Sequence, residues 1–337
     1  MSNSSVIVAL SDAEIADFFP GEMWAEFERL VPGYRRIKLP LARPDEWYQL
    51  WRHSPGDILI SAWQTPSLNS EILPADLTSL RYICYLAGSV RKLVPRALIE
   101  QGIVVTNWGG SISPTVAECT LMLILMALRR ASHWAVAMHR DGQWKDSTTM
   151  TQSLVGRRVG IHGFGLISQQ LVPMLRPFTS DIQVYSPHMS DNIFSDHGVK
   201  RLDSLEELFA TSDVVVELAA LTPENHHIID EKILRLIRPG GVFVNVGRGS
   251  LVDEAALARV AKEGKIQVAL DVFEVEPLPK ESPFRGLPNV TLLPHLGGPT
   301  RDRRCDSGRL ALRNLRAYLE GKPLEAVISL DVYDRST

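Results

Sequence analysis

This chain has few cysteines, no large excess of positive or negative charge, and no long apolar run. Its three cysteines, Cys84, Cys119 and Cys305, lie far apart and show no CxxC spacing. This pattern argues against a disulfide framework and against a zinc site, so we expect no metal and a reducing, cytoplasmic location. The formal net charge of -3 shows no electrostatic preference for nucleic acid or for an anionic membrane.

Targeting features are also missing from the sequence. The N-terminal residues have only a short apolar run and no basic segment before it, so we expect no signal peptide. The longest apolar run, Leu121–Leu128, is expected to be too short to span a bilayer. With 45% hydrophobic and 22% charged residues, the composition is that of a soluble globular protein. A length of 337 residues suits two domains.

Short apolar runs alternate with helical patterns, which predicts an α/β fold with parallel sheets. The first part has one predicted amphipathic helix, Asp12–Leu30, and four predicted strands: Val6–Leu10, Ile58–Ser61, Tyr82–Leu86 and Val104–Asn107. A long helix then follows, with Ser113 as its cap and Pro114 in the first turn. Because Val116–Leu128 is apolar on nearly every face, this helix is expected to be buried.

The second part alternates more regularly and resembles a doubly wound dinucleotide-binding domain. Its six predicted strands are Val159–His162, Ile182–Tyr185, Val214–Glu217, Val242–Val246, Ile266–Leu270 and Val290–Leu293. Its predicted helices are Leu166–Leu175, Leu205–Phe209, Glu231–Ile237 and Glu254–Lys262. The final helix, Arg301–Leu319, is followed by no further predicted strand of that sheet, so we expect it to fold back on the first domain.

A glycine motif follows the first strand of the second part. Gly163, Phe164, Gly165, Leu166 and Ile167 form GxGxx, and Ser168 takes the place of the third small residue. The first glycine permits a tight turn, and the second lets a pyrophosphate approach the start of a helix. The position between a predicted strand and a predicted helix favours cofactor binding over an ordinary glycine turn.

The residue that selects between NAD and NADP is expected at the end of the next strand. That place falls on Ser186, where no carboxylate is present to bind a ribose hydroxyl or to repel a 2′-phosphate. No arginine or lysine stands there either, and only His188 is close. The sequence therefore leaves the choice open, with a lean to NADP or dual use. Asp191 or a water molecule is the alternative partner for the ribose.

Three further segments follow predicted strands, at the edge where open α/β sheets bind ligands. They are Asn245–Ser250, Asp271–Pro277 and Leu293–Gly298, and they carry Arg248, Glu276 and His295. Reduction of a keto group builds negative charge on its oxygen, which a protonated imidazole can neutralise by donating a proton. A neighbouring carboxylate favours the protonated imidazole, and a guanidinium can bind a substrate carboxylate. Taken singly, each residue has an ordinary structural explanation; together they favour a catalytic site.

These motifs, in this order, resemble the D-isomer-specific 2-hydroxyacid dehydrogenases over nearly the whole chain, most densely from Ser113 to Thr300. The resemblance implies Arg248, Glu276 and His295 as the catalytic set. It also implies that Asp271, Val246 and Ala220 lie at the cofactor, and that the loop Ala87, Gly88 and Ser89 binds the substrate carboxylate together with Arg248.

The resemblance further implies two Rossmann-like or flavodoxin-like domains with an interdomain cleft and a homodimer built on the Pro114–Leu128 helix. The expected substrate domain is discontinuous, comprising residues 1–110 and 300–337, and the dinucleotide-binding domain spans residues 111–299. The sequence departs from the family at Ser168, at Ser186 and at Leu218–Ala220, where the family often has His-x-Pro. These departures concern the cofactor and not the catalytic set.

Several alternatives remain open at this point. The leading hypothesis is a reductase of a small 2-keto acid such as glyoxylate or hydroxypyruvate. A phosphoglycerate-type dehydrogenase is a second enzyme hypothesis, and a dinucleotide-sensing, corepressor-like binding protein is the alternative from another class. Arg91 is either an extra anion contact or a solvent-facing residue. The histidines His162, His226 and His227 are expected to be structural.

Overall fold

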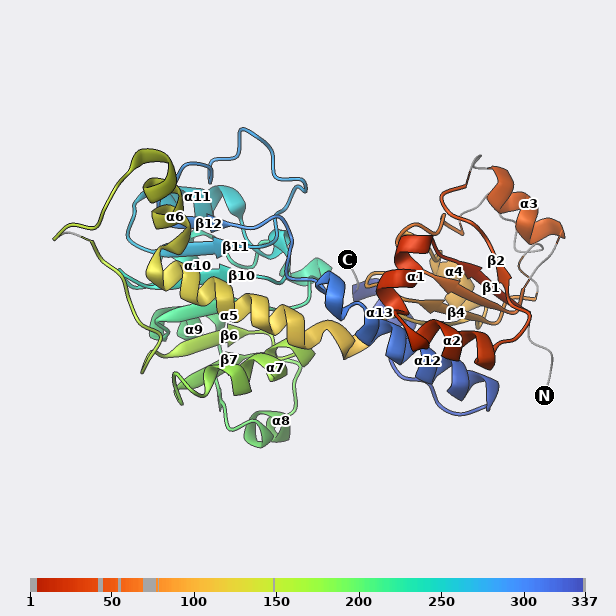
Figure 1. Ribbon diagram of the computed structural model, residues 1–337. Helices are drawn as coiled ribbons and strands as arrows, with labels where there is room; N and C mark the ends of the chain where they lie inside the picture. The colour runs from red at the N-terminus through yellow and green to blue at the C-terminus, as the bar shows by residue number, and fades with distance from the viewer. Residues whose placement is uncertain are drawn as a thin grey trace. The chain divides into compact units, whose positions relative to one another are not determined.

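The chain forms two compact α/β units (Figure 1). The computed structural model describes residues 5–41, 45–53, 56–68, 77, 79–147 and 149–335. Unit 1 comprises Met1–Ile112 and Pro299–Thr337, and unit 2 comprises Ser113–Gly298. These bounds lie close to those expected from the sequence. Both sheets are parallel, which confirms the predicted α/β class.

Unit 1 is built on a five-stranded sheet in the order β2-β1-β3-β4-β5. Its strands are β1 (Val6–Ala9), β2 (Arg35–Arg36), β3 (Ile58–Ser61), β4 (Tyr82–Tyr85) and β5 (Val104–Thr106). Its helices are α1 (Asp12–Phe18), α2 (Glu22–Leu30), α3 (Asp45–His53), α4 (Arg96–Glu100), α12 (Cys305–Leu319) and α13 (Leu330–Arg335). This strand order is that of a flavodoxin-like sheet.

Alternating residues of these strands face two separate cores. Ile7 and Leu59 face the core that contains Trp47 of α3, whereas Val8 and Ile60 face the core that contains Phe18 of α1. Helix α12 packs against α1, α2 and β4, so the C-terminal segment belongs to unit 1 as expected.

The predicted single helix Asp12–Leu30 is wrong, because the structure has two helices there. Phe19, Pro20 and Gly21 separate α1 from α2. Gly21 has a φ of +59°, a left-handed conformation that ends the helical path. The sequence analysis also missed α3, although Trp47 and Trp51 mark one apolar face of it, and the two-residue strand β2, which consists of two arginines.

Unit 2 is built on a seven-stranded sheet in the order β12-β11-β10-β9-β6-β7-β8. Its strands are β6 (Val159–His162), β7 (Ile182–Tyr185), β8 (Lys200–Arg201), β9 (Val214–Glu217), β10 (Val242–Asn245), β11 (Gln267–Leu270) and β12 (Val290–Leu292). Six strands agree with the predicted positions, and β8 is a seventh that the sequence analysis missed. The chain reverses its direction of progress across the sheet between β6 and β9, where doubly wound folds bind ligands.

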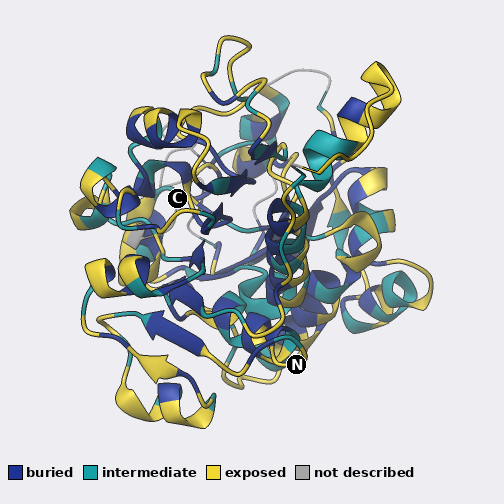
Figure 2. Cartoon of the chain, turned by 90° about the vertical axis from the view of Figure 1, so that its left-hand side faces the viewer, coloured by how far each residue is buried: buried dark blue, intermediate teal, exposed yellow. Residues whose placement is uncertain are grey.

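Helices cover both faces of the unit 2 sheet. They are α5 (Ser113–Arg129), α6 (Ala131–Asp141), α7 (Leu166–Leu175), α8 (Asp191–Asp196), α9 (Leu205–Thr211), α10 (Glu231–Leu234) and α11 (Glu254–Lys262). Helix α5 packs against α7, β10 and β11. Helices α9, α10 and α11 share a core with Val215, Phe243 and Val268 of the strands. Apart from the exposed edge strand β8, the strands appear as buried in Figure 2, with exposed residues on the outer sides of the helices.

Helix α5 corrects the expectation about membrane spans. Together with the preceding 3-10 turn (Gly109–Ile112), it makes a segment, Gly109–Arg129, that is long and apolar enough to cross a membrane by length and composition. In the structure, Ala117, Leu123 and Ile124 of this helix are buried against the rest of unit 2. Ser113 is the first residue of the helix and not the capping residue before it.

Candidate active site

Three neighbouring strands of unit 2 end at the candidate active site. β10, β11 and β12 pair in parallel, so the segments that follow them begin at one edge of the sheet. Arg248 follows β10, Glu276 follows β11 and His295 follows β12. The sheet topology therefore brings together residues that lie far apart in the sequence.

His295 and Glu276 form the central contact of this site. The Nδ1 atom of His295 lies 2.7 Å from Oε2 of Glu276, while Oε1 of Glu276 accepts a hydrogen bond from the backbone N–H of Phe273 at 3.0 Å. Both side chains remain partly open, with 49% of His295 and 36% of Glu276 exposed. Because Nδ1 faces the carboxylate, Nε2 is the ring nitrogen left to exchange a proton with a ligand.

The loop that carries His295 is held by the buried carboxylate of Asp271. Its two oxygens accept hydrogen bonds from the backbone N–H groups of Leu296 and Gly297 at 2.7 and 2.8 Å. The N–H of His295 also donates to the carbonyl of Asp271 at 2.9 Å, and His295 has a φ of +53°. Asp271 therefore fixes a backbone conformation that is costly for a non-glycine residue. The sequence analysis placed Asp271 near the cofactor and missed this anchoring role.

Arg248 supplies the positive charge of the site. Its Nη1 donates to the carbonyl of Gly247 at 2.7 Å, and the next residue begins the 3-10 turn Gly249–Leu251. Loss of hydration to the surrounding protein lowers the pKa of Arg248, and the charge of Glu276 opposes that effect. An arginine stays protonated at neutral pH, so the site holds a cation beside a carboxylate and an imidazole.

Gly163 and Gly165 of the glycine loop differ in their surroundings. Gly163 has a φ of +83°, and a Cβ atom there would lie 2.5 Å from Cα of Ala219. A Cβ at Gly165 would meet no protein atom within 4 Å, and Gly165 is the capping residue of helix α7, whose first turn has no side-chain cap. Open space at an uncapped helix start fits the approach of a pyrophosphate. Ser168 is buried, and its hydroxyl donates to the carbonyl of Gly163 at 2.7 Å, so serine fits the third position.

A buried charged pair lies directly beneath this loop. His162 ends β6 and Glu217 ends β9, and Nδ1 of His162 lies 2.5 Å from Oε2 of Glu217. The other carboxylate oxygen accepts a hydrogen bond from the N–H of Ala219 at 2.7 Å. The contact between His162 and Glu217 thus connects the strand before Gly163 to the segment Leu218–Ala220. The sequence analysis treated His162 as structural and missed its partner, because pairing across strands is not visible in sequence spacing.

The predicted ribose position lies at the end of β7. Ser186 is partly exposed there, and the carboxylate of Asp191 is paired with Arg201 of the neighbouring strand β8. Asp191 was an alternative partner for the ribose, but in the structure its carboxylate forms an ion pair with this arginine. The sequence analysis missed strand β8 and therefore did not find this ion pair.

Ala220 and Val246, the other two predicted cofactor residues, follow β9 and β10 at the same edge of the sheet. Ala220 is exposed, and its carbonyl accepts a hydrogen bond from the side-chain amide of Asn225 at 2.7 Å. Val246 is buried. Their positions fit a ligand lying along the carboxyl ends of β9 and β10.

The predicted substrate loop belongs to unit 1 and follows β4. Ala87 is buried, and Gly88 and Ser89 are partly exposed. A Cβ at Gly88 would lie 2.6 Å from the ring of Trp108, so only glycine fits there. The carbonyl of Gly88 accepts a hydrogen bond from Asn107 at 2.9 Å, which fixes the loop. Arg91 is exposed, and its guanidinium lies 5.8 Å from the ring centre of Tyr333; whether it contacts an anion stays a prediction.

Comparison with known proteins agrees with this geometry. Residues 121–297 match the family described as "D-isomer specific 2-hydroxyacid dehydrogenase, NAD binding domain". The chain is 32% identical over 325 residues to a glyoxylate reductase of Aeropyrum pernix, covering 94% of this chain and 92% of that protein. The chain belongs to the D-isomer-specific 2-hydroxyacid dehydrogenase family. It is therefore a nicotinamide-dependent oxidoreductase, as the sequence predicted.

Two further relatives complete the comparison. A D-3-phosphoglycerate dehydrogenase of Methanocaldococcus jannaschii is 34% identical over 82% of this chain, but the chain spans only 52% of that protein. The crystal structure of a glyoxylate reductase from Paecilomyes thermophila matches with a TM-score of 0.80 and 27% identity, covering 97% of this chain and 99% of that one. The match to a solved structure over both units confirms the predicted fold.

Proposed function

We propose that this dehydrogenase reduces a small 2-keto acid of the glyoxylate or hydroxypyruvate class, with His295 as the proton donor. The observation that carries the proposal is the contact between His295 and Glu276 at the strand edge that also bears Arg248. The named glyoxylate reductases among its relatives support the substrate class.

Each residue of the proposed catalytic set has a separate role in the reaction. A bound nicotinamide supplies the hydride in reduction and accepts it in oxidation. Arg248 binds the substrate carboxylate and polarises the neighbouring carbonyl, since a guanidinium matches a carboxylate with two hydrogen bonds. His295 donates the proton from Nε2 to the carbonyl oxygen as negative charge develops there. Glu276 orients the imidazole through Nδ1 and stabilises its protonated form. In oxidation, His295 takes the proton back.

The substrate carboxylate has a second proposed contact in unit 1. The loop formed by Ala87, Gly88 and Ser89 offers backbone N–H groups, and the packing of Gly88 on Trp108 holds that loop in place. We assign to this loop a contact with the substrate carboxylate, as the family resemblance implies.

For the cofactor we propose NADP(H), or dual use of both nucleotides. The glycine loop Gly163–Ile167 would hold the pyrophosphate. Ser186 lacks the negative charge that excludes a 2′-phosphate.

A substrate panel tests the proposed activity. The loss of NADPH absorbance, and then of NADH absorbance, is followed with glyoxylate, hydroxypyruvate, pyruvate, phenylpyruvate and phosphohydroxypyruvate. Rapid oxidation with glyoxylate or hydroxypyruvate supports the proposal. A clear preference for phosphohydroxypyruvate would favour a phosphoglycerate-type dehydrogenase, the second candidate, which the relative in Methanocaldococcus jannaschii supports. Cofactor binding without oxidation of any substrate would favour a dinucleotide-sensing protein.

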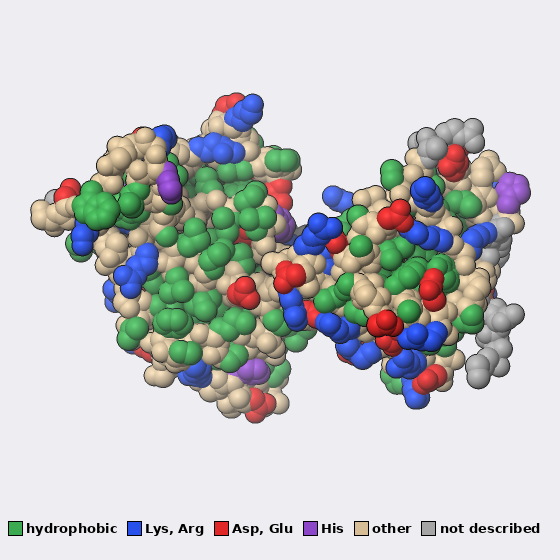
Figure 3. Space-filling model, in the orientation of Figure 1, with side chains coloured by type: hydrophobic (Ala, Val, Ile, Leu, Met, Phe, Trp, Pro, Cys, Tyr) green, Lys and Arg blue, Asp and Glu red, His purple; other side chains and the backbone are tan. Residues whose placement is uncertain are grey.

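We further propose a cytoplasmic homodimer that acts without nucleic acid or membrane. Three free cysteines support a reducing compartment. Apolar side chains gather on the face of unit 2 over α5 (Figure 3). Met122 of α5 and Val136 and Met138 of α6 are 42%, 51% and 48% exposed. A surface of this kind on a soluble protein marks an interface. Light scattering after gel filtration tests the assembly, and a monomeric mass would overturn it.

A further inference from the structure

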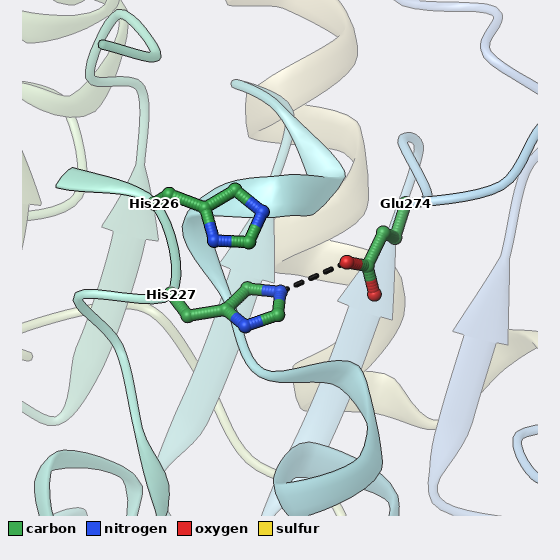
Figure 4. A group of neighbouring side chains, drawn as sticks. All are labelled: His226, His227 and Glu274. Carbon is green, nitrogen blue, oxygen red and sulfur yellow. Dashed lines mark hydrogen bonds and ion pairs between the residues drawn. The ribbon is translucent and has the colours of Figure 1, made fainter. Parts of the chain in front are cut away.

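A group of two histidines and one glutamate lies outside the proposed catalytic set. His226 and His227 follow the 3-10 turn Pro223–Asn225, and Glu274 follows β11. One potential ligand atom from each of the three side chains lies within 4.8 Å of the others. Figure 4 shows the two imidazole rings side by side, with the carboxylate of Glu274 facing them. The ring centres are 3.9 Å apart, and Nε2 of His227 lies 2.9 Å from Oε1 of Glu274.

The backbone conformation brings the two consecutive histidines together. Side chains of neighbouring residues in extended backbone point to opposite sides. His227 instead has a φ of +54°, a left-handed conformation that non-glycine residues rarely adopt. Its backbone N–H donates to the carbonyl of Ser250 at 2.9 Å, which holds the segment in place. The rings of His226 and His227 therefore lie on one side of the chain.

The backbone of Glu274, the third residue of the group, is also held in place. The backbone N–H of Glu274 donates to Oε1 of Glu254 at 2.6 Å. The preceding residue, Phe273, packs closely on Gly249. A Cβ atom added to Gly249 would lie 2.0 Å from the carbonyl carbon of Phe273. Backbone hydrogen bonds therefore hold both ligand segments, with the three ligand atoms within 4.8 Å of one another.

We propose that His226, His227 and Glu274 form a binding site for a transition-metal ion of the zinc class. Two imidazoles and one carboxylate are a set that binds Zn²⁺ with the remaining position open to solvent. Hard cations such as Mg²⁺ prefer oxygen ligands alone, so two nitrogens select against them. His227 and Glu274 are each 37% exposed, which leaves room for a water ligand and for entry of the ion. The absence of CxxC spacing does not exclude a site made of histidine and carboxylate.

The bound ion would connect the segment at His226 to the loop that carries Glu276. Glu274 is two positions before Glu276, whose carboxylate contacts His295 at 2.7 Å. The ion would lie outside the reaction itself, because its ligands are distinct from Arg248, Glu276 and His295. Its role is a structural cross-link within unit 2, and its binding does not depend on which substrate the enzyme reduces.

Metal binding to the full chain, prepared without an affinity tag and treated with a chelator, tests this proposal. Zn²⁺ is titrated by calorimetry, and Co²⁺ by its visible absorption, which reports the nitrogen and oxygen ligands directly. We expect one ion per chain and a raised thermal midpoint with Zn²⁺. Glu274→Gln and His226→Gln should each weaken binding at least about tenfold, since each removes one of three ligands. His227→Asn, which tolerates a positive φ, should do the same without unfolding the segment.

Two control variants separate this site from other histidines. His188→Gln removes an exposed histidine elsewhere on unit 2 and should leave binding unchanged. His295→Gln removes the imidazole of the proposed catalytic set and should also leave metal affinity unchanged. Loss of binding in His295→Gln would place the ion at the catalytic set and overturn the proposal. Absence of saturable binding up to about 1 mM Zn²⁺ would overturn it as well, as would unchanged affinity in the folded Glu274→Gln and His227→Asn variants.

Discussion

The buried pair of His162 and Glu217 makes the stability of unit 2 sensitive to a single substitution. Glu217 is fully buried, and its carboxylate is satisfied by His162 at 2.5 Å and by the N–H of Ala219 at 2.7 Å. His162→Leu removes the imidazole and leaves the carboxylate buried without its partner. Breaking a buried pair in this way costs about 3–5 kcal/mol, a large part of a typical domain's stability.

A second variant separates the loss of the pair from a simple packing defect. In the double variant His162→Leu with Glu217→Gln, no buried charge remains, and the side-chain carbonyl of the introduced glutamine can still accept from the N–H of Ala219. Replacement of both charges is often nearly neutral, so the double variant should recover most of the lost stability. The measurement is the free energy of unfolding from urea titrations, compared across the wild type and both variants. A double variant no more stable than His162→Leu would refute the reasoning.

The same pair predicts a pH dependence of stability. Burial alone would lower the pKa of His162, but the charge of Glu217 and its hydrogen bond outweigh burial and raise the pKa above its ordinary value of 6.5. The folded protein then holds this proton more tightly than the unfolded chain does. The stabilisation is therefore complete below pH 6.5 and is lost as the pH rises through the folded-state pKa. The ring of Tyr185 also faces His162, with the two ring centres 5.6 Å apart. The double variant should not show this decline.

Four other positions of unit 2 give further tests. Gly165→Ala should fold normally but raise the KM for the nucleotide, because the added Cβ enters the open space that the nucleotide would occupy. Gly163→Ala should instead destabilise the protein, because its Cβ would clash with Ala219. Thermal melts and nucleotide titrations separate the two effects. Ser186→Asp should shift the preference from NADPH to NADH, measured as the ratio of kcat/KM values, and an unchanged ratio would contradict the placement of the ribose. Burial raises the pKa of Cys119 to about 11, so native protein should resist alkylation by iodoacetamide near neutral pH, and rapid labelling seen by mass spectrometry would contradict this.

The sequence predicted the parts of the fold whose apolar patterns are strong. β6, β7 and β9 lie where the buried runs placed them, because strands covered on both faces are continuously apolar. Strand β8 is only Lys200–Arg201 and is polar, so no apolar run marks it. The break between α1 and α2 was also missed, although Pro20 and Gly21 are a signal that could have found it.

The candidate site was predictable to a similar extent. Arg248, Glu276 and His295 were found because each follows a predicted strand, and parallel strands end at one edge. The hydrogen bonds from Leu296 and Gly297 to Asp271 were not predictable, because they depend on the path of a loop in three dimensions. The grouping of His226 and His227 with Glu274 was missed for the same reason.

The most direct test of the account compares wild type with His295→Gln in two measurements on the same preparations. One is kcat/KM for the best 2-keto acid, and the other is the affinity for NAD(P)H from its fluorescence. We predict that the variant loses about 10²–10⁴-fold in kcat/KM, as expected for loss of a general acid, and binds NAD(P)H as the wild type does. A variant that keeps most of the wild-type rate would contradict the assignment of His295 as the proton donor.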